Sequence, residues 1–224
     1  MRFPSKPTQT AESETEPAPE LANCASCRKN STWYRMPSPS VVALISVVVL
    51  VAGILVVVRH SPARAYQPSD LPKIEAQVRR DFADVVQLSP RDFTALRSTA
   101  APLVVDVREN GEFAVSHIDG AVRVDPDISV SEFVEKIAKS ATGRNVVLYC
   151  SVGVRSSKLA ARANKALQSL NVKGVYNLEG GLFRWHNERR NLVDATGATE
   201  RIHPYDAHWG GLVARQDQVA TTPR

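Results

Sequence analysis

Residues 145–161 read NVVLYCSVGVRSSKLAA: an apolar run, a cysteine, a glycine-containing loop and the start of a helical pattern. The run 145–149 has the length of a buried β-strand, and apolar residues recur at helical spacing after the loop. A strand that passes through a short loop into a helix points backbone N–H groups, and the positive end of the helix dipole, at the first loop residue. That residue is Cys150, so the stretch predicts a thiolate nucleophile and an enzyme.

Strand and helix patterns alternate on both sides of this stretch. Further strands are predicted at residues 85–88, 103–107 and 174–178. Helices are predicted after an N-cap at Ser89, after a capping box from Ser129 to Glu132, and over residues 182–191. Strands that alternate with helices predict an α/β fold with a parallel sheet flanked by helices. Ligands bind such sheets beyond the carboxyl ends of the strands, where both Cys150 and Arg108 follow predicted strands.

Three separated blocks of the sequence, taken in order, are typical of one family. They are residues 104–108 with Glu112-Phe113 and 117–121, the loop 150–155, and residues 177–182 with Trp185. Together they resemble the rhodanese-like sulfurtransferases over residues 85–194, which implies the rhodanese-like parallel sheet and sulfur-transfer chemistry. Ser116 and Asp119 stand where family members often carry glycine and proline. Both are turn positions, so the departure leaves the implied chemistry unchanged.

The resemblance implies that Cys150 attacks the outer sulfur of thiosulfate or of a persulfide, carries it as a persulfide, and passes it to a thiol or to cyanide. The acceptor thiol belongs to a small molecule or to a protein. The predicted substrate-binding residues are Ser151, Val152, Gly153, Val154, Arg155 and Arg108. Arg155 is expected either to bind an anionic donor or to brace the loop. Arg108 is expected either to reach the site or to pair with Glu109 or Glu112.

The implied mechanism calls for no cofactor and no metal. The loop interior is neutral at Ser151 and Val152, where thiosulfate-preferring relatives often carry basic residues. A persulfide donor is therefore favoured at least as strongly as thiosulfate. His117 is expected to be a hydrogen-bonded structural histidine, because sulfur transfer of this kind needs no general base.

Two other functions compete with sulfur transfer. Phosphatases related to this fold use a Cys-x5-Arg loop, but here Arg155 stands one position too early and Ser156 occupies the arginine position. The second alternative is a non-catalytic, membrane-tethered rhodanese-like module that binds a partner. Such modules often lack the cysteine, which this chain retains together with Gly153 and Arg155.

The remaining sequence predicts a membrane-anchored form with several separate parts. Residues 41–58 form an uncharged apolar run long enough for a transmembrane helix, which implies a single-pass membrane protein. An uncleaved anchor is favoured over a cleaved signal because forty residues precede the run. The predicted parts are a disordered arm at 1–40, the transmembrane helix, a linker at 59–84, the rhodanese-like domain at 85–194 and a tail at 195–224.

Charged and metal-ligating residues outside the loop predict little further chemistry. The formal net charge of +5 comes from scattered basic residues, so nucleic-acid binding is not expected. Cys24 and Cys27 lack the two further ligands that a structural zinc needs. The tail residues His203, Asp206 and His208 are expected to pack against the domain or the membrane surface rather than bind a metal.

Overall fold

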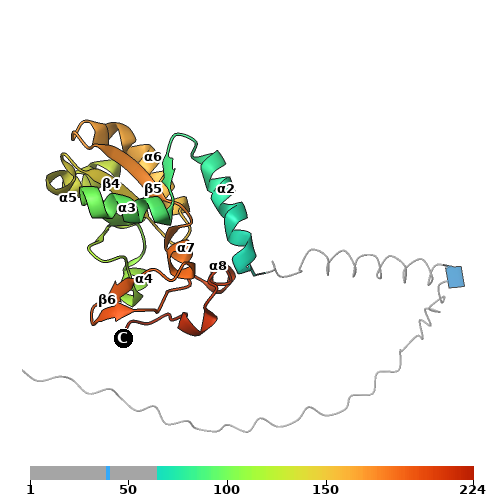
Figure 1. Ribbon diagram of the computed structural model, residues 1–224. Helices are drawn as coiled ribbons and strands as arrows, with labels where there is room; N and C mark the ends of the chain where they lie inside the picture. The colour runs from blue at the N-terminus through green and yellow to red at the C-terminus, as the bar shows by residue number, and fades with distance from the viewer. Residues whose placement is uncertain (1–38, 41–64) are drawn as a thin grey trace, which may run out of the picture. The chain divides into compact units, whose positions relative to one another are not determined.

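The structure, a computed structural model, describes residues 39–40 and 65–224 (Figure 1). The predicted transmembrane segment 41–58 lies outside the described residues, as do the two cysteines of the arm and the rest of residues 1–38. Among the described residues, no helix combines the length and the apolar character that a membrane span requires. All of residues 65–224 belong to one compact unit.

A five-stranded sheet with the order β1-β5-β4-β2-β3 runs through the centre of this unit. Every pair of neighbouring strands is parallel. The strands are β1 (Val86–Leu88), β2 (Leu103–Asp106), β3 (Val122–Arg123), β4 (Asn145–Tyr149) and β5 (Gly174–Leu178). This sheet confirms the α/β prediction and the bounds predicted for β4 and β5. Because β4 is the central strand, Cys150 follows it at the middle of the carboxyl edge of the sheet.

Helices cover both faces of the sheet, as predicted (Figure 1). Val146 and Leu148 of β4 pack against one set of helices, and Val147 and Tyr149 pack against the other. This division follows from the alternation of side chains along a strand, and it explains why all five residues of β4 are buried. The first set is α5 (Val130–Ala141) and α6 (Val154–Gln168); the second is α2 (Leu71–Asp81), α3 (Pro90–Ala100) and α7 (Gly181–Asn187).

The predicted helix starts are confirmed, but one predicted helix end is wrong. The Ser89 hydroxyl accepts the Asp92 N–H at 3.1 Å at the start of α3, and the Ser129 hydroxyl accepts the Glu132 N–H at 3.2 Å at the start of α5. The helix predicted to continue to residue 191 ends at Asn187. The chain turns there because Arg189 adopts a left-handed conformation with a φ of 56°.

Segments on both sides of the predicted 85–194 domain fold onto the same sheet. The predicted linker contributes η1 (Pro68–Asp70) and α2, and Leu71 of α2 belongs to the buried core. The tail contributes Leu212 and Val213 to the same core, and both are fully buried. In Figure 1 the tail lies near α4 and α7. The remaining elements are α4 (Asn110–Val115), the hairpin β6 (Leu192–Asp194) and β7 (Gly197–Thr199), α8 (Ala207–Gly210) and η2 (Gln216–Gln218).

Candidate active site

The thiol of Cys150 lies where β4 gives way to α6. The backbone N–H of Gly153 donates a hydrogen bond to the Cys150 sulfur at 3.2 Å. Gly153 has a φ of 99°, and a Cβ at this position would lie 2.9 Å from the amide nitrogen of Asn177, so glycine suits this turn on both counts. Within residues 65–224, this is the one backbone amide bonded to the sulfur, whereas the sequence predicted several.

The start of α7 is hydrogen-bonded to the backbone of the loop that begins at Cys150. The N–H groups of Leu182 and Phe183 donate to the carbonyl oxygens of Cys150 and Ser151, at 2.8 and 2.9 Å. These are first-turn amides that have no partner within their own helix, so the loop carbonyls satisfy them. Gly181 permits this contact, since a Cβ there would overlap the Cys150 carbonyl oxygen. The third sequence block, residues 177–182, thereby fixes the backbone of the second block, the loop 150–155.

The sulfur opens into a small pocket, although Cys150 as a residue is only 1% exposed. The pocket has a volume of about 180 Å³. It brings together most of the predicted site, with two aromatic residues from the tail. Its lining residues are Cys150, Ser151, Val152, Val154, Arg155, Tyr205 and Trp209.

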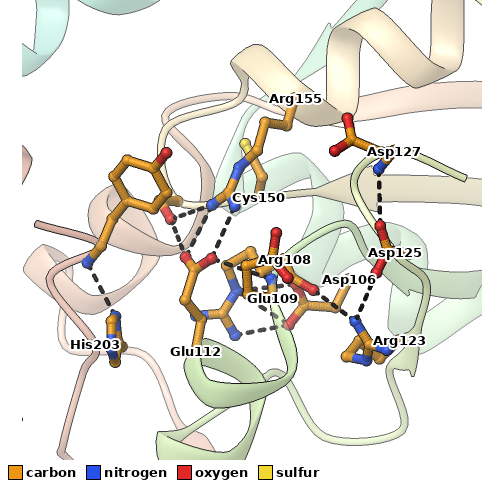
Figure 2. A network of polar contacts seen from close by, with 12 residues as sticks. Asp106, Arg108, Glu109, Glu112, Arg123, Asp125, Asp127, Cys150, Arg155 and His203 are labelled. Carbon is orange, nitrogen blue, oxygen red and sulfur yellow. Dashed lines mark hydrogen bonds and ion pairs between the residues drawn. The ribbon is translucent and has the colours of Figure 1, made fainter. Parts of the chain in front are cut away.

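Arg155 is fixed at this pocket by a carboxylate from α4. Its two terminal nitrogens each donate to one carboxylate oxygen of Glu112 at 2.8 Å, and one of them also donates to the Ser151 hydroxyl at 2.9 Å. The Ser151 hydroxyl in turn donates to Glu112 at 2.8 Å. Figure 2 shows the Arg155 guanidinium facing Glu112 with Cys150 beside it. Two parallel bonds of this kind set both the charge and the orientation of the guanidinium.

The electrostatics of this pair keep both partners charged. Burial favours the neutral acid of Glu112, but the hydrogen bonds and the positive charge of Arg155 outweigh it, and the pKa of Glu112 is lowered from 4.5. Burial likewise disfavours charge on Arg155, but Glu112 and the attraction of Cys150 dominate and raise the pKa of Arg155. At neutral pH the pocket therefore presents a cation whose charge is already paired.

Arg108 does not line the Cys150 pocket, so it does not reach the site as the sequence suggested, and its ion-pair partner is Asp106 rather than the alternative partners Glu109 or Glu112. Its side chain is fully buried and donates to both carboxylate oxygens of Asp106, at 2.9 and 2.7 Å (Figure 2). It also donates to the carbonyl oxygen of Ser116 at 2.7 Å. It also lies over the ring of Tyr149, with 5.7 Å to the ring centroid. Burial opposes its charge, but Asp106 more than compensates and raises the pKa of Arg108. The guanidinium is thus held as a buried ion-pair partner.

His117 and His203 make contacts with nearby backbone groups. Nδ1 of His117 lies 3.0 Å from the carbonyl oxygen of Phe113, and the two rings stack at 3.8 Å, as expected for a structural histidine. In the tail, burial lowers the pKa of His203, and its Nδ1 accepts the Tyr205 N–H at 3.1 Å. Within the part of the chain that the structure describes, no group of three or more His, Cys, Asp or Glu residues could hold a metal ion.

The comparison with protein families agrees with the three sequence blocks. Residues 89–188 match the family model of the rhodanese-like domain. These residues carry the sheet from β2 onward, the Cys150 loop, Glu112 and α7. The match covers less than half of the chain, so it shows that this segment is similar to the rhodanese-like domain.

Relatives of the rhodanese-like domain differ in their overall length. The Synechocystis protein slr1261 is 35% identical over 100 residues, which cover 45% of this chain and 51% of that protein. The tRNA uridine(34) hydroxylase of Brucella ovis is 28% identical over 105 residues, which cover 45% of this chain and 32% of the hydroxylase. The chain thus spans about half of the one relative and about a third of the other.

Similar solved structures include a rhodanese-related protein from Thermoplasma volcanium and a thiosulfate sulfurtransferase from Pseudomonas aeruginosa. The first is 23% identical with a TM-score of 0.39, and covers 48% of this chain and 97% of its own. The second is 20% identical with a TM-score of 0.43, and covers 57% of this chain and 23% of its own.

The sequence-based prediction missed two residues that line the pocket, Tyr205 and Trp209, and one that orients Arg155, Glu112. Glu112 belongs to the first sequence block, but nothing in the local sequence indicates that its carboxylate reaches Arg155, 43 residues away. Tyr205 and Trp209 lie in the tail, outside the residues 89–188 that match the family model. Their contact with the Cys150 loop depends on the path of the tail across the sheet edge, which no local pattern encodes.

Proposed function

We propose that this chain is a sulfurtransferase that carries sulfane sulfur as a persulfide on Cys150. The main support is the placement of one thiol at the central carboxyl edge of the sheet. There it accepts the Gly153 N–H and opens into a pocket that Arg155 lines. A sulfur nucleophile in contact with a backbone donor at the start of a 15-residue helix is suited to attack and to hold negative charge.

The proposed reaction has two steps. In the first, the Cys150 thiolate attacks the outer sulfur of a donor, thiosulfate or a persulfide, and forms a new S–S bond. The donor's own S–S bond breaks, and its electron pair leaves on sulfite or on a thiolate. In the second, a thiol or cyanide attacks the outer sulfur of the Cys150 persulfide, and the Cys150 thiolate is the leaving group. No external oxidant or reductant is required.

Each neighbouring group has a role that its contacts support. The Gly153 amide is placed to stabilise negative charge on sulfur, and α7 holds the loop carbonyls so that this amide stays in position. Arg155 attracts an anionic sulfur and is oriented by Glu112. Ser151 links the two, because its hydroxyl contacts both Arg155 and Glu112.

Intact-mass spectrometry of the full chain tests this function. After incubation with thiosulfate or with a small persulfide, the protein should gain about 32 Da, the mass of one sulfur, and lose it on addition of cyanide or dithiothreitol. Cys150→Ser should abolish the gain, since it removes the acceptor atom. The matched control is Cys24→Ser with Cys27→Ser, which removes the other two thiols and should retain the adduct. Sulfur uptake that persists in Cys150→Ser would refute the proposal.

We also propose that the enzyme is attached to a membrane through residues 41–58. The support is the uncharged apolar run itself, which is long enough to cross the hydrocarbon core. Extraction of membranes with alkaline carbonate should leave the chain in the pellet, and deletion of residues 41–58 should release it. Recovery of the intact chain in the supernatant would contradict this attachment.

A further inference from the structure

Two aromatic residues of the tail form one wall of the Cys150 pocket. Tyr205 and Trp209 contribute this wall, and Val152 and Val154 of the loop contribute the apolar surface beside it. Tyr205 is 47% exposed and Val154 is 39% exposed, so the mouth of the pocket is both apolar and open to solvent. The sulfur-transfer steps described above require neither aromatic residue.

The wall is rigidly built. The Asp206 carboxylate caps α8 by accepting the N–H groups of His208 and Trp209, each at 2.8 Å. The Trp209 ring packs against the ring of Tyr66, with 4.9 Å between the centroids. Asn187 of α7 holds the following segment by donating to the Leu212 carbonyl oxygen at 2.9 Å. Trp209 is therefore held by the Asp206 cap before it, by the Tyr66 ring, and by the Asn187 bond to the segment after it.

Tyr205 is held in place against a backbone preference. Its φ is 67°, a left-handed value that is uncommon for residues other than glycine. Its N–H donates to His203, and its ring lies under the Arg155 guanidinium, 4.8 Å from the centroid. Strain of this kind persists where the surrounding structure holds a side chain in position, and it is concentrated at functional sites.

The charge of the pocket disfavours a small dianion. Arg155 is the one cation among the lining residues that the structure shows, and Glu112 already accepts from both of its terminal nitrogens. Thiosulfate carries two negative charges and would meet a Cys150 thiolate beside a cation that is already paired. The rest of the mouth is mostly valine and aromatic surface, which offers no further positive charge to an anion.

We propose that Tyr205 and Trp209, with Val152 and Val154, form a subsite for the apolar body of an organic persulfide, R–S–SH, and select it over thiosulfate. This inference rests on the proposed sulfurtransferase function and specifies its donor. A cavity of about 150 Å³ is large enough to bind benzene, so a volume of about 180 Å³ accommodates an aryl or branched alkyl group. The apolar body lies against the aromatic wall, and the outer sulfur faces Cys150.

The transfer is balanced without any further reactant. The Cys150 thiolate attacks the outer sulfur of R–S–SH, and the new S–S bond forms as the donor's S–S bond breaks. The electron pair leaves on R–S⁻, and the proton stays on the transferred sulfur. Cys150 becomes Cys–S–SH, and the apolar thiolate R–S⁻ departs through the open mouth and takes a proton from water.

The test compares benzyl persulfide with thiosulfate on the full chain. The rate of sulfur gain on Cys150 is followed by intact mass under single-turnover conditions, with each donor in turn. The readout is the ratio of the two second-order rate constants, because the intrinsic reactivity of each donor cancels when variants are compared. The expected result is therefore a change of this ratio between the wild-type chain and its variants.

Three variants locate the selectivity. Tyr205→Ala and Trp209→Ala should each lower the ratio by about five- to tenfold, through slower reaction with benzyl persulfide. Val154→Lys should lower the ratio by speeding the reaction with thiosulfate, because it adds an unpaired cation at the exposed mouth. A gain of rate cannot arise from misfolding. The matched control is Val219→Ala, which loosens the tail at its bridge to Ile202, away from the pocket, and should leave the ratio unchanged.

The outcomes separate this inference from the function on which it depends. If neither donor adds sulfur to Cys150, the proposed function fails. If sulfur is added but Tyr205→Ala and Trp209→Ala slow the reaction with both donors equally, the function stands and the apolar subsite is refuted. A ratio that stays constant in the Tyr205, Trp209 and Val154 variants refutes it equally, as does a Val219→Ala effect equal to theirs.

Discussion

Two arginines of this molecule have the same kinds of partner but face different surroundings. Arg108 follows β2, pairs with Asp106, and lies over the ring of Tyr149. Arg155 follows the loop after β4, pairs with Glu112, and lies over the ring of Tyr205. The Arg108 side chain is 0% exposed, whereas 23% of the Arg155 side chain is exposed.

This difference shows which arginine can meet a substrate. Both side chains follow a carboxyl end of the sheet, where ligands are expected to bind, so position along the chain does not separate them. Arg108 is sealed: its guanidinium donates to Asp106 and to the Ser116 carbonyl, lies over the Tyr149 ring, and has no exposed surface. Arg155 lines the open pocket beside the exposed Tyr205. A small molecule can therefore approach its guanidinium through the pocket.

The largest effect is expected for Arg108→Ala. Removal of one partner from a fully buried ion pair leaves the Asp106 charge uncompensated, so the free energy of unfolding should fall by about 3–5 kcal/mol. Urea denaturation followed by circular dichroism measures the loss. The double variant Asp106→Leu with Arg108→Met is the matched control and should recover most of the stability, because it removes both charges. A single variant as stable as the wild type would contradict a sealed pair.

A smaller effect, on activity rather than stability, is expected for Arg155→Ala. Loss of one charged donor at a reacting centre typically slows the reaction by about a hundredfold, so sulfur uptake by Cys150 should fall by about that factor. The rate is measured by intact mass with the benzyl persulfide donor. Arg155→Lys keeps the charge but loses the paired bonds to Glu112. Its rate of sulfur uptake should lie between those of the wild type and Arg155→Ala. If the folded fraction of Arg108→Ala lost as much rate of sulfur uptake as Arg155→Ala, the claim that only Arg155 meets the substrate would be wrong.

The smallest effect concerns Glu112 and its dependence on pH. Glu112→Gln replaces a charged acceptor of two Arg155 bonds and should cost about 2 kcal/mol of unfolding free energy at pH 7. Because the folded-state pKa of Glu112 lies below 4.5, its stabilisation is fully present above pH 4.5 and is lost as the pH falls through the folded-state value. Urea titrations at pH 7 and at successively lower pH measure the difference between variant and wild type. A difference that stays constant down to acid pH would contradict the assigned charge.

Local sequence was a reliable guide where short-range physics is decisive. The bounds of β4 follow from a run of apolar residues, and the starts of α3 and α5 follow from hydroxyl caps that act within three residues. The end of α7 was missed because a left-handed Arg189 stops it without a glycine or proline. The short strand β3 was missed because two residues carry no periodic pattern.

The alternation of buried strands and capped helices was enough to determine a parallel α/β sheet, and the order of residues 150–155 was enough to place a thiol, a glycine and an arginine in one loop. The partner that orients Arg155, the burial of Arg108 and the aromatic wall of Tyr205 and Trp209 were decided only by the tertiary structure. Caps and strand periods depend on neighbours a few residues apart. A guanidinium and a carboxylate 43 residues apart, or a loop and a tail 55 residues apart, meet only when the whole chain packs around one core.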